Sequence, residues 1–277
     1  MKILENKTEL QEFLKEISQK GKKIGLIPTM GAIHQGHLSL IKTCQELGYF
    51  SLVTIFVNPT QFNELIDFEM YPRNIDNDKK SLESINTDLL FFPATKDLYP
   101  DGIKSEKIVL KYRNILCDIN RSGHFDGVTT VVNSLFDLIK PDHVFFGEKD
   151  FQQLKIIQKM LKNTRSSIIM HSCPSIRMSN GISYSSRYKK FSISEEKIFN
   201  DVANTLMQSI SDLRKNFNIK IIDDLKKKLI ESGLKKIDYL QIKNEINLLP
   251  SFEKNNSRLF VAFYIGTIRI IDDFILY

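Results

Sequence analysis

Residues 24–37, which read IGLIPTMGAIHQGH, decide the fold that the sequence predicts. The apolar run at 23–27 is closed by Pro28, a pattern typical of a buried parallel strand. From Gly36 to Gly48, apolar residues recur at helical spacing. The chain therefore passes from a strand through a tight loop into a helix, which is the building unit of doubly wound parallel sheets.

The same alternation continues along the chain. Strands are expected at 50–57, 89–92 and 143–146, and further helices at 7–20, 75–85, 128–139 and 151–161. Strands separated by helices pair in parallel, so residues 1–174 are predicted to form a Rossmann-like α/β domain.

The character of the sequence changes after Pro174. Two lysine-rich helical stretches, 194–217 and 222–232, precede strands expected at 237–243, 259–265 and 268–271. Gly266 and Thr267 separate the last two strands and indicate a hairpin turn. Residues 175–277 are therefore predicted to form a second, smaller α+β lid domain.

Composition excludes several classes of protein. The chain has 277 residues, 42% of them hydrophobic, which is enough to bury a core. Lys and Arg number 39 against 33 Asp and Glu, a scattered excess of six that does not indicate a nucleic-acid-binding surface. No secretory signal and no run of about 18 apolar residues is found, so a cytoplasmic protein is expected. Cys44, Cys117 and Cys173 lack the spacing of a disulfide framework or a zinc site.

Two histidines, His34 and His37, follow the first strand at the start of the helix. A helix N-terminus offers free N–H groups and partial positive charge, which suit phosphates. Gly31 and Gly36 let the backbone approach a ligand, and histidines three apart share one face of the helix. The bare HxxH spacing also occurs in half-formed metal sites and on ordinary surfaces; the strand and the glycines around it favour a phosphate site.

Two later segments carry further groups suited to phosphates. Residues 147–150 read Gly-Glu-Lys-Asp directly after the strand at 143–146, where Lys149 can neutralise phosphate charge. Residues 184–187 read Tyr-Ser-Ser-Arg, and two hydroxyls beside a guanidinium can clamp β- and γ-phosphates. Each segment alone is typical of an ordinary polar loop. It is their combination, in this order along the chain, that indicates a phosphate-binding site.

That order resembles the pantothenate synthetase family, the pantoate–β-alanine ligases of the nucleotidylyltransferase superfamily. The resemblance covers almost the whole chain. It rests on residues 27–31 with the two histidines, and on 56–62, 71–73, 98–100, 123–128, 146–153 and 185–187.

The resemblance implies an activity: ATP-dependent condensation of pantoate with β-alanine through pantoyl adenylate, releasing AMP and pyrophosphate. It implies Mg2+ carried by the ATP phosphates with no protein ligand set, no tightly bound organic cofactor, and no nucleic-acid or membrane partner. It also implies a homodimer. His37, His34 and Lys149 are the implied catalytic residues.

Binding residues are carried over position by position. For ATP they are Met30, Gly31, Ala32, Ile33, His34, Gln35, Gly36, His37, Gly147, Glu148, Lys149, Asp150, Ile176, Tyr184, Ser185, Ser186 and Arg187. Gln61 and Gln153 are implied for pantoate, and Gln61 also for β-alanine. Asn58, Tyr71, Arg121 and His124 line or approach the family's site, whereas His143 and His171 are interpreted as structural.

The sequence departs from the family's pattern in two loops. Ser122 stands where proline is usual, which predicts a less rigid loop. In the second loop, Asn180 replaces a common acidic residue, Ser183 a common alanine and Tyr188 a common asparagine. These changes are expected to affect loop closure and nucleotide affinity.

Two other functions stay open from the residues alone. A transferase could leave an adenylyl or cytidylyl group on a phosphorylated acceptor, and labelled α-phosphate would then remain on that acceptor. A tRNA-binding synthetase-like module would instead show salt-sensitive tRNA binding without ATP turnover.

Overall fold

The computed structural model describes residues 1–164 and 166–277 and divides the chain into two compact units. The first unit comprises Met1–Arg113, Arg121–Glu148 and Gln153–Pro174. The second comprises Asn114–Asn120, Lys149–Gln152 and Ser175–Tyr277. Two short segments from the first 174 residues thus belong to the second unit.

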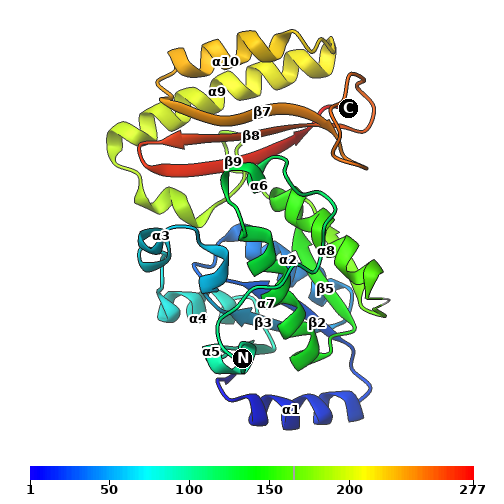
Figure 1. Cartoon of the computed structure of the whole chain (residues 1–277). Helices are drawn as coiled ribbons and strands as arrows, with labels where there is room; N and C mark the ends of the chain where they lie inside the picture. Colours follow the sequence, from blue (N-terminus) through cyan, green and yellow to red (C-terminus); the bar gives the residue numbers. More distant parts are fainter. Residues whose placement is uncertain (165) are drawn as a thin grey trace. The chain divides into compact units, whose positions relative to one another are not determined.

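The first unit is built on a six-stranded parallel sheet (Figure 1). Its strands are β1 (Lys2–Leu4), β2 (Ile24–Thr29), β3 (Phe50–Ile55), β4 (Leu89–Phe91), β5 (His143–Gly147) and β6 (Ile169–Cys173). Their order is β1-β4-β3-β2-β5-β6, and every pairing is parallel. The doubly wound parallel sheet is confirmed. The edge strands β1 and β6 were not predicted. Strand β1 has only three residues, and β6 has a single buried residue, so neither shows a long apolar run.

Helices connect these strands. They are α1 (Lys7–Gln19), α2 (Gln35–Glu46), η1 (Pro59–Gln61), α3 (Leu65–Glu69), α4 (Ile75–Glu83), α5 (Thr95–Leu98), α6 (Cys117–Asn120), α7 (His124–Ile139), η2 (Glu148–Asp150) and α8 (Phe151–Asn163). Helix α7 begins four residues before the position that its apolar spacing indicated, because the first turn contains buried polar residues. Among the described residues, no helix combines the length and the apolar character needed to cross a membrane.

Both faces of the parallel sheet are buried. On one face, Ile27, Val53, Leu90 and Phe145 form a cluster with residues of α2 and α4. Their strand neighbours Leu26, Leu52, Leu89 and Val144 are also completely buried. Because successive side chains of a strand point to opposite faces, helices must cover the second face as well.

The second unit contains a three-stranded antiparallel sheet in the order β7-β8-β9. Its elements are η3 (Ser186–Lys190), α9 (Ile193–Lys215), α10 (Ile221–Glu231), β7 (Lys236–Asn244), β8 (Ser257–Ile265) and β9 (Ile268–Ile275). Helices α9 and α10 pack together along this sheet, and their leucines share a core with it (Figure 1). Ile265 pairs with Ile268, which confirms the predicted two-residue hairpin at Gly266 and Thr267.

Candidate active site

Strands β2 and β5 are neighbours at the place where the strand order reverses. The chain proceeds from β2 through β3 to β4 on one side, and from β5 to β6 on the other. Ligands of open parallel sheets bind outside the carboxyl ends of the strands at such a reversal. Strand β2 ends at Thr29 and β5 ends at Gly147, so the two predicted segments that follow these strands start at the expected edge.

The loop after β2 is fixed by a buried carboxylate. Asp78 on α4 is 4% exposed, and it accepts hydrogen bonds from Ala32 N (2.9 Å) and Ile33 N (2.7 Å). Gly31 has φ +81°, and a Cβ there would lie 2.9 Å from Asp78 Oδ2, so glycine is required. Thr29 Oγ1 accepts from Gly31 N at 3.1 Å. The N–H groups of Ala32 and Ile33 therefore point at Asp78, and the histidines that follow are the better donors for a phosphate.

His34 is the N-cap of α2. Its Nδ1 accepts a hydrogen bond from Gly36 N at 3.1 Å, so in the neutral ring the proton lies on Nε2. The rings of His34 and His37 stack with their centroids 4.0 Å apart, as the spacing predicts. His34 thus has a ring nitrogen committed to the helix and a second one able to donate to an anion.

Gln61, in η1, lies beside Met30. Gln61 Nε2 donates to Met30 Sδ at 3.1 Å, and Gln61 Oε1 accepts from Asn58 Nδ2 at 3.1 Å. Asn58 is 1% exposed and also donates to Gly127 O at 3.1 Å. Three of the predicted residues therefore form one hydrogen-bonded group, in which the orientation of the Gln61 amide is set.

His124 and Arg121 hold the backbone of Gln61. The Gln61 carbonyl accepts from His124 Nδ1 (2.7 Å) and from Arg121 Nη2 (3.1 Å). Arg121 Nη1 lies 3.2 Å from His124 Nε2. An arginine can only donate, so His124 is neutral with its proton on Nδ1. The carbonyl of Ser122 accepts from Asn63 Nδ2 at 2.7 Å, and the lower rigidity of this loop stays a prediction.

Tyr99 completes this polar group. Its hydroxyl donates to Asn58 Oδ1 at 2.5 Å, and burial raises the pKa of this phenol. A Cβ on Gly127 would lie 2.4 Å from Thr60 O, so α7 approaches η1 as closely as glycine permits. Tyr71 is 9% exposed and its ring packs edge-on against Phe62, with centroids 5.7 Å apart.

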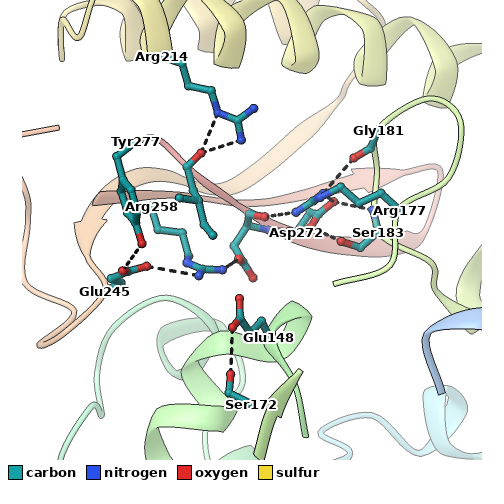
Figure 2. Close-up of polar contacts among 12 residues, drawn as sticks. Glu148, Ser172, Arg177, Gly181, Ser183, Arg214, Glu245, Arg258, Asp272 and Tyr277 are labelled. Atoms are coloured by element: carbon teal, nitrogen blue, oxygen red, sulfur yellow. Dashed lines mark hydrogen bonds and ion pairs between the residues drawn. The ribbon is translucent and has the colours of Figure 1, made fainter. Parts of the chain in front are cut away.

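The segment after β5 begins with a turn of η2. Glu148 Oε1 accepts from Ser172 Oγ at 3.0 Å, which ties the turn to β6 (Figure 2). Lys149 Nζ lies 3.7 Å from Asp150 Oδ2, and 21% of the lysine side chain is exposed. Gln153 is half-buried on α8. Its neighbour Gln152 is buried and bonds the backbone of residues 115 and 117, so it serves the packing of the second unit.

In the second unit, residues 176–184 form a small hairpin. Ile176 O accepts from Tyr184 N at 3.0 Å, and Arg177 bridges to Ser183. Ser185 is the N-cap of η3, and its Oγ accepts from Arg187 N at 3.3 Å. A hydroxyl that accepts one hydrogen bond can still donate another, which suits a phosphate oxygen. Ser186 is 9% exposed.

A carboxylate of β9 anchors this hairpin. Asp272 is 3% exposed, and its oxygens accept from Ser183 Oγ (2.7 Å), Ser183 N (2.8 Å) and Arg177 Nη1 (3.1 Å), as Figure 2 shows. Neither Asp78 nor Asp272 was predicted from the sequence. A carboxylate at a position otherwise suited to an apolar residue was the available signal in each case.

The histidines interpreted as structural lie together in the first unit. His143 Nδ1 is 3.0 Å from His171 Nε2, and Tyr49 stacks on His143 with centroids 3.8 Å apart. His143 is the first residue of β5, at the opposite end of the strand from Gly147. Their place in the sheet agrees with a packing role.

A parallel sheet whose order reverses beside a histidine-bearing loop and helix N-terminus defines a Rossmann-like nucleotide-binding enzyme. The model of the family "Pantoate-beta-alanine ligase" matches residues 2–275. The chain belongs to the pantoate-beta-alanine ligase family and is a ligase.

The chain is similar to named relatives and to solved structures over its whole length. The chain is 37% identical to a pantothenate synthetase of Sulfurihydrogenibium sp. (strain YO3AOP1), with 99% of each chain covered. It is 37% identical to that of Thermotoga petrophila, with 100% of each covered. A Francisella tularensis ligase, complexed with Beta-gamma ATP and Beta-alanine, has a TM-score of 0.87 at 36% identity over 100% of this chain and 98% of that one. The Thermus thermophilus enzyme has a TM-score of 0.91 at 29% identity, with 100% of each covered.

Proposed function

We propose that this chain condenses pantoate with β-alanine using ATP, with pantoyl adenylate as the bound intermediate. The observation that carries the proposal is the pair of neighbouring strand ends, β2 and β5, at the reversal of the strand order, followed by His34 and by Lys149. Membership of the ligase family supports it, and favours it over nucleotidyl transfer to a phosphorylated acceptor and over a tRNA-binding module.

In the first step the pantoate carboxylate attacks the α-phosphorus of ATP and pyrophosphate leaves. The protein makes no covalent bond, so positioning and charge stabilisation supply the rate. We assign the donors around the phosphates to the Nε2–H of His34, to His37 and to Lys149. The loop of Ser185, Ser186 and Arg187 binds the β- and γ-phosphates in this assignment.

In the second step the amine of β-alanine attacks the acyl carbon and AMP leaves. Gln61 and Gln153 hold pantoate, and Gln61 also orients β-alanine. The contact of Gln61 Nε2 with Met30 Sδ supports this role, because a thioether is a weak acceptor that a hydroxyl or carboxylate oxygen displaces readily. The bond from Asn58 then keeps the amide facing the substrate.

In this proposal Mg2+ would be carried by the ATP phosphates and would supply charge neutralisation for the pyrophosphate leaving group. Within the described parts of the chain, no three His, Cys, Asp or Glu side chains are grouped closely enough to hold a metal ion. Phosphate oxygens are the hard ligands that Mg2+ prefers. The homodimer and the cytoplasmic location stay predictions, and light scattering of the purified protein measures the first.

The experiment that tests the reaction follows ATP labelled at the α-phosphate. We expect pyrophosphate exchange that depends on pantoate, and labelled AMP with an amide product once β-alanine is added. Lys149→Ala should slow the exchange by about 100-fold, because it removes a charge beside the phosphates. Lys162→Ala, an exposed lysine on α8, is the matched control. Label retained on an acceptor, or exchange without pantoate, would contradict the proposal.

A further inference from the structure

The loop of Ser185, Ser186 and Arg187 is tied at both of its ends to one residue, Ser183. Before the loop, the side chain and the N–H of Ser183 bond the carboxylate of Asp272. After the loop, the Tyr188 hydroxyl donates to the carbonyl of Ser183 at 2.8 Å. Ser183 and Tyr188 are thus the two fixed points between which the proposed phosphate-binding residues lie.

Asp272 is well suited to be an anchor. Its Oδ1 also accepts from Asp273 N at 2.8 Å, so each carboxylate oxygen has two donors. Arg177, which pairs with Asp272, donates to Asp273 O at 2.6 Å and lies over the ring of Phe274, 4.3 Å from its centroid. These contacts fix the first strand of the hairpin to β9 (Figure 2). A buried carboxylate with this many donors has little freedom to move.

Tyr188 is held independently of the hairpin. Its ring packs against Phe199 and Phe191, with centroids 4.8 Å and 5.7 Å away. Burial raises the pKa of its phenol, so the hydroxyl keeps its hydrogen at all physiological pH values. The aromatic cluster therefore presents a permanent donor to the Ser183 carbonyl.

We propose that Tyr188 and Ser183 are positioning residues, which hold the loop of Ser185–Arg187 in the conformation that binds the β- and γ-phosphates. This inference rests on the proposed role of that loop. A loop held in its binding conformation has no ordering to complete when the ligand arrives, so the fraction of competent protein, and with it the apparent affinity, rises. Neither residue needs to contact the nucleotide.

The test compares ligands with and without the terminal phosphates. Tyr188→Phe removes the hydroxyl and keeps the ring. We expect the Kd for β,γ-methylene ATP to rise about 5-fold in calorimetry, the loss typical of one hydrogen bond, while the Kd for AMP stays unchanged. In the exchange assay the KM for ATP should rise with kcat nearly constant, because saturating ATP selects the competent loop.

Tyr239→Phe is the matched control. Tyr239 is buried in the same unit and its hydroxyl lies 3.1 Å from Cys117 Sγ, away from the hairpin. It should lose a similar amount of thermal stability without changing either Kd. Ser183→Ala removes the bond to Asp272 by a separate route and should also raise the Kd for the ATP analogue alone. In the double variant with Tyr188→Phe the two effects should not add, since both act through Ser183.

Arg187→Ala separates the inference from the proposed function. If Arg187→Ala leaves the affinity for β,γ-methylene ATP unchanged, the loop does not bind those phosphates and the function assigned to it fails. If Arg187→Ala weakens that affinity but Tyr188→Phe and Ser183→Ala behave like Tyr239→Phe, the loop role stands and the positioning inference is overturned. Equal weakening of AMP and of the ATP analogue by Tyr188→Phe would also overturn it.

Discussion

The loop at 30–37 and the loop at 184–187 are both assigned to phosphates, yet they are held in different ways. The first connects a central strand to a helix, and Asp78 takes the N–H groups of two consecutive loop residues. The second is held through Ser183, whose side chain and N–H bond Asp272 and whose carbonyl accepts from the Tyr188 hydroxyl. Each loop thus depends on one buried carboxylate from a distant element.

The difference lies in what each anchor grips. Asp78 binds backbone N–H groups, and its carboxylate lies so close to Gly31 that a Cβ at this position would clash with it. Asp272 binds a serine side chain and an arginine as well as backbone, and side-chain contacts can be replaced one by one. Three of the positions expected to depart from the family's pattern, 180, 183 and 188, lie in or beside this second loop.

The largest effect should come from the first loop. His34→Ala removes both the helix cap and the Nε2–H, whereas His34→Asn keeps a capping side chain and removes the imidazole. We expect both variants to lose about 100-fold or more in pantoate-dependent exchange, and His34→Asn to retain the unfolding temperature of the wild type. An active His34→Asn variant would show that His34 serves the cap alone.

The same substitution in each anchor sharpens the comparison. Asp78→Asn and Asp272→Asn each replace a buried acceptor oxygen with an NH2 group that faces other hydrogen-bond donors. Each should therefore lower the free energy of unfolding by about 3 kcal/mol. Asp78→Asn should weaken AMP and β,γ-methylene ATP alike, and Asp272→Asn the ATP analogue alone. Asp76→Asn and Asp201→Asn, both exposed, are the controls for denaturant unfolding and calorimetry. If both buried variants change the affinities for AMP and for β,γ-methylene ATP in the same way, the two loops do not differ in the phosphates they bind.

The smallest effect concerns the pH dependence of stability, through two histidines of the parallel sheet. Burial, then His171 and Lys23, lower the pKa of His143 below 6.5, with Asp142 opposing, and burial lowers that of His171. The folded rings stay neutral where unfolded rings take up protons, so this stability is present above pH 6.5 and is lost as the pH falls through the lowered values. Unfolding temperatures from pH 8 to 5 should fall less steeply for His171→Gln. Parallel curves for this variant and the wild type would refute the idea.

The core of the fold could be read from periodicity because the strands β2, β3, β4 and β5 are continuous apolar runs. The edge strand β6 could not, since Cys173 is its only buried residue and the strand has no continuous apolar run. Among the predicted residues, Met30, Asn58, Gln61, Arg121 and His124 form connected hydrogen bonds in the first unit. Spacing along the chain cannot show that these segments, about 30 and 60 residues apart, touch each other.

The sequence by itself determined the alternation of the four central strands with helices, the histidines at a helix start and the resemblance to a ligase family, because periodicity and motif spacing are local properties of the chain. The tertiary structure decided which carboxylates hold the loops, which nitrogen of His34 carries the proton and which tyrosine closes the second loop. Those depend on groups such as Asp78 and Asp272, brought from 45 and 89 positions away. Only the folded chain, through burial that makes each unpaired donor costly, selects such partners.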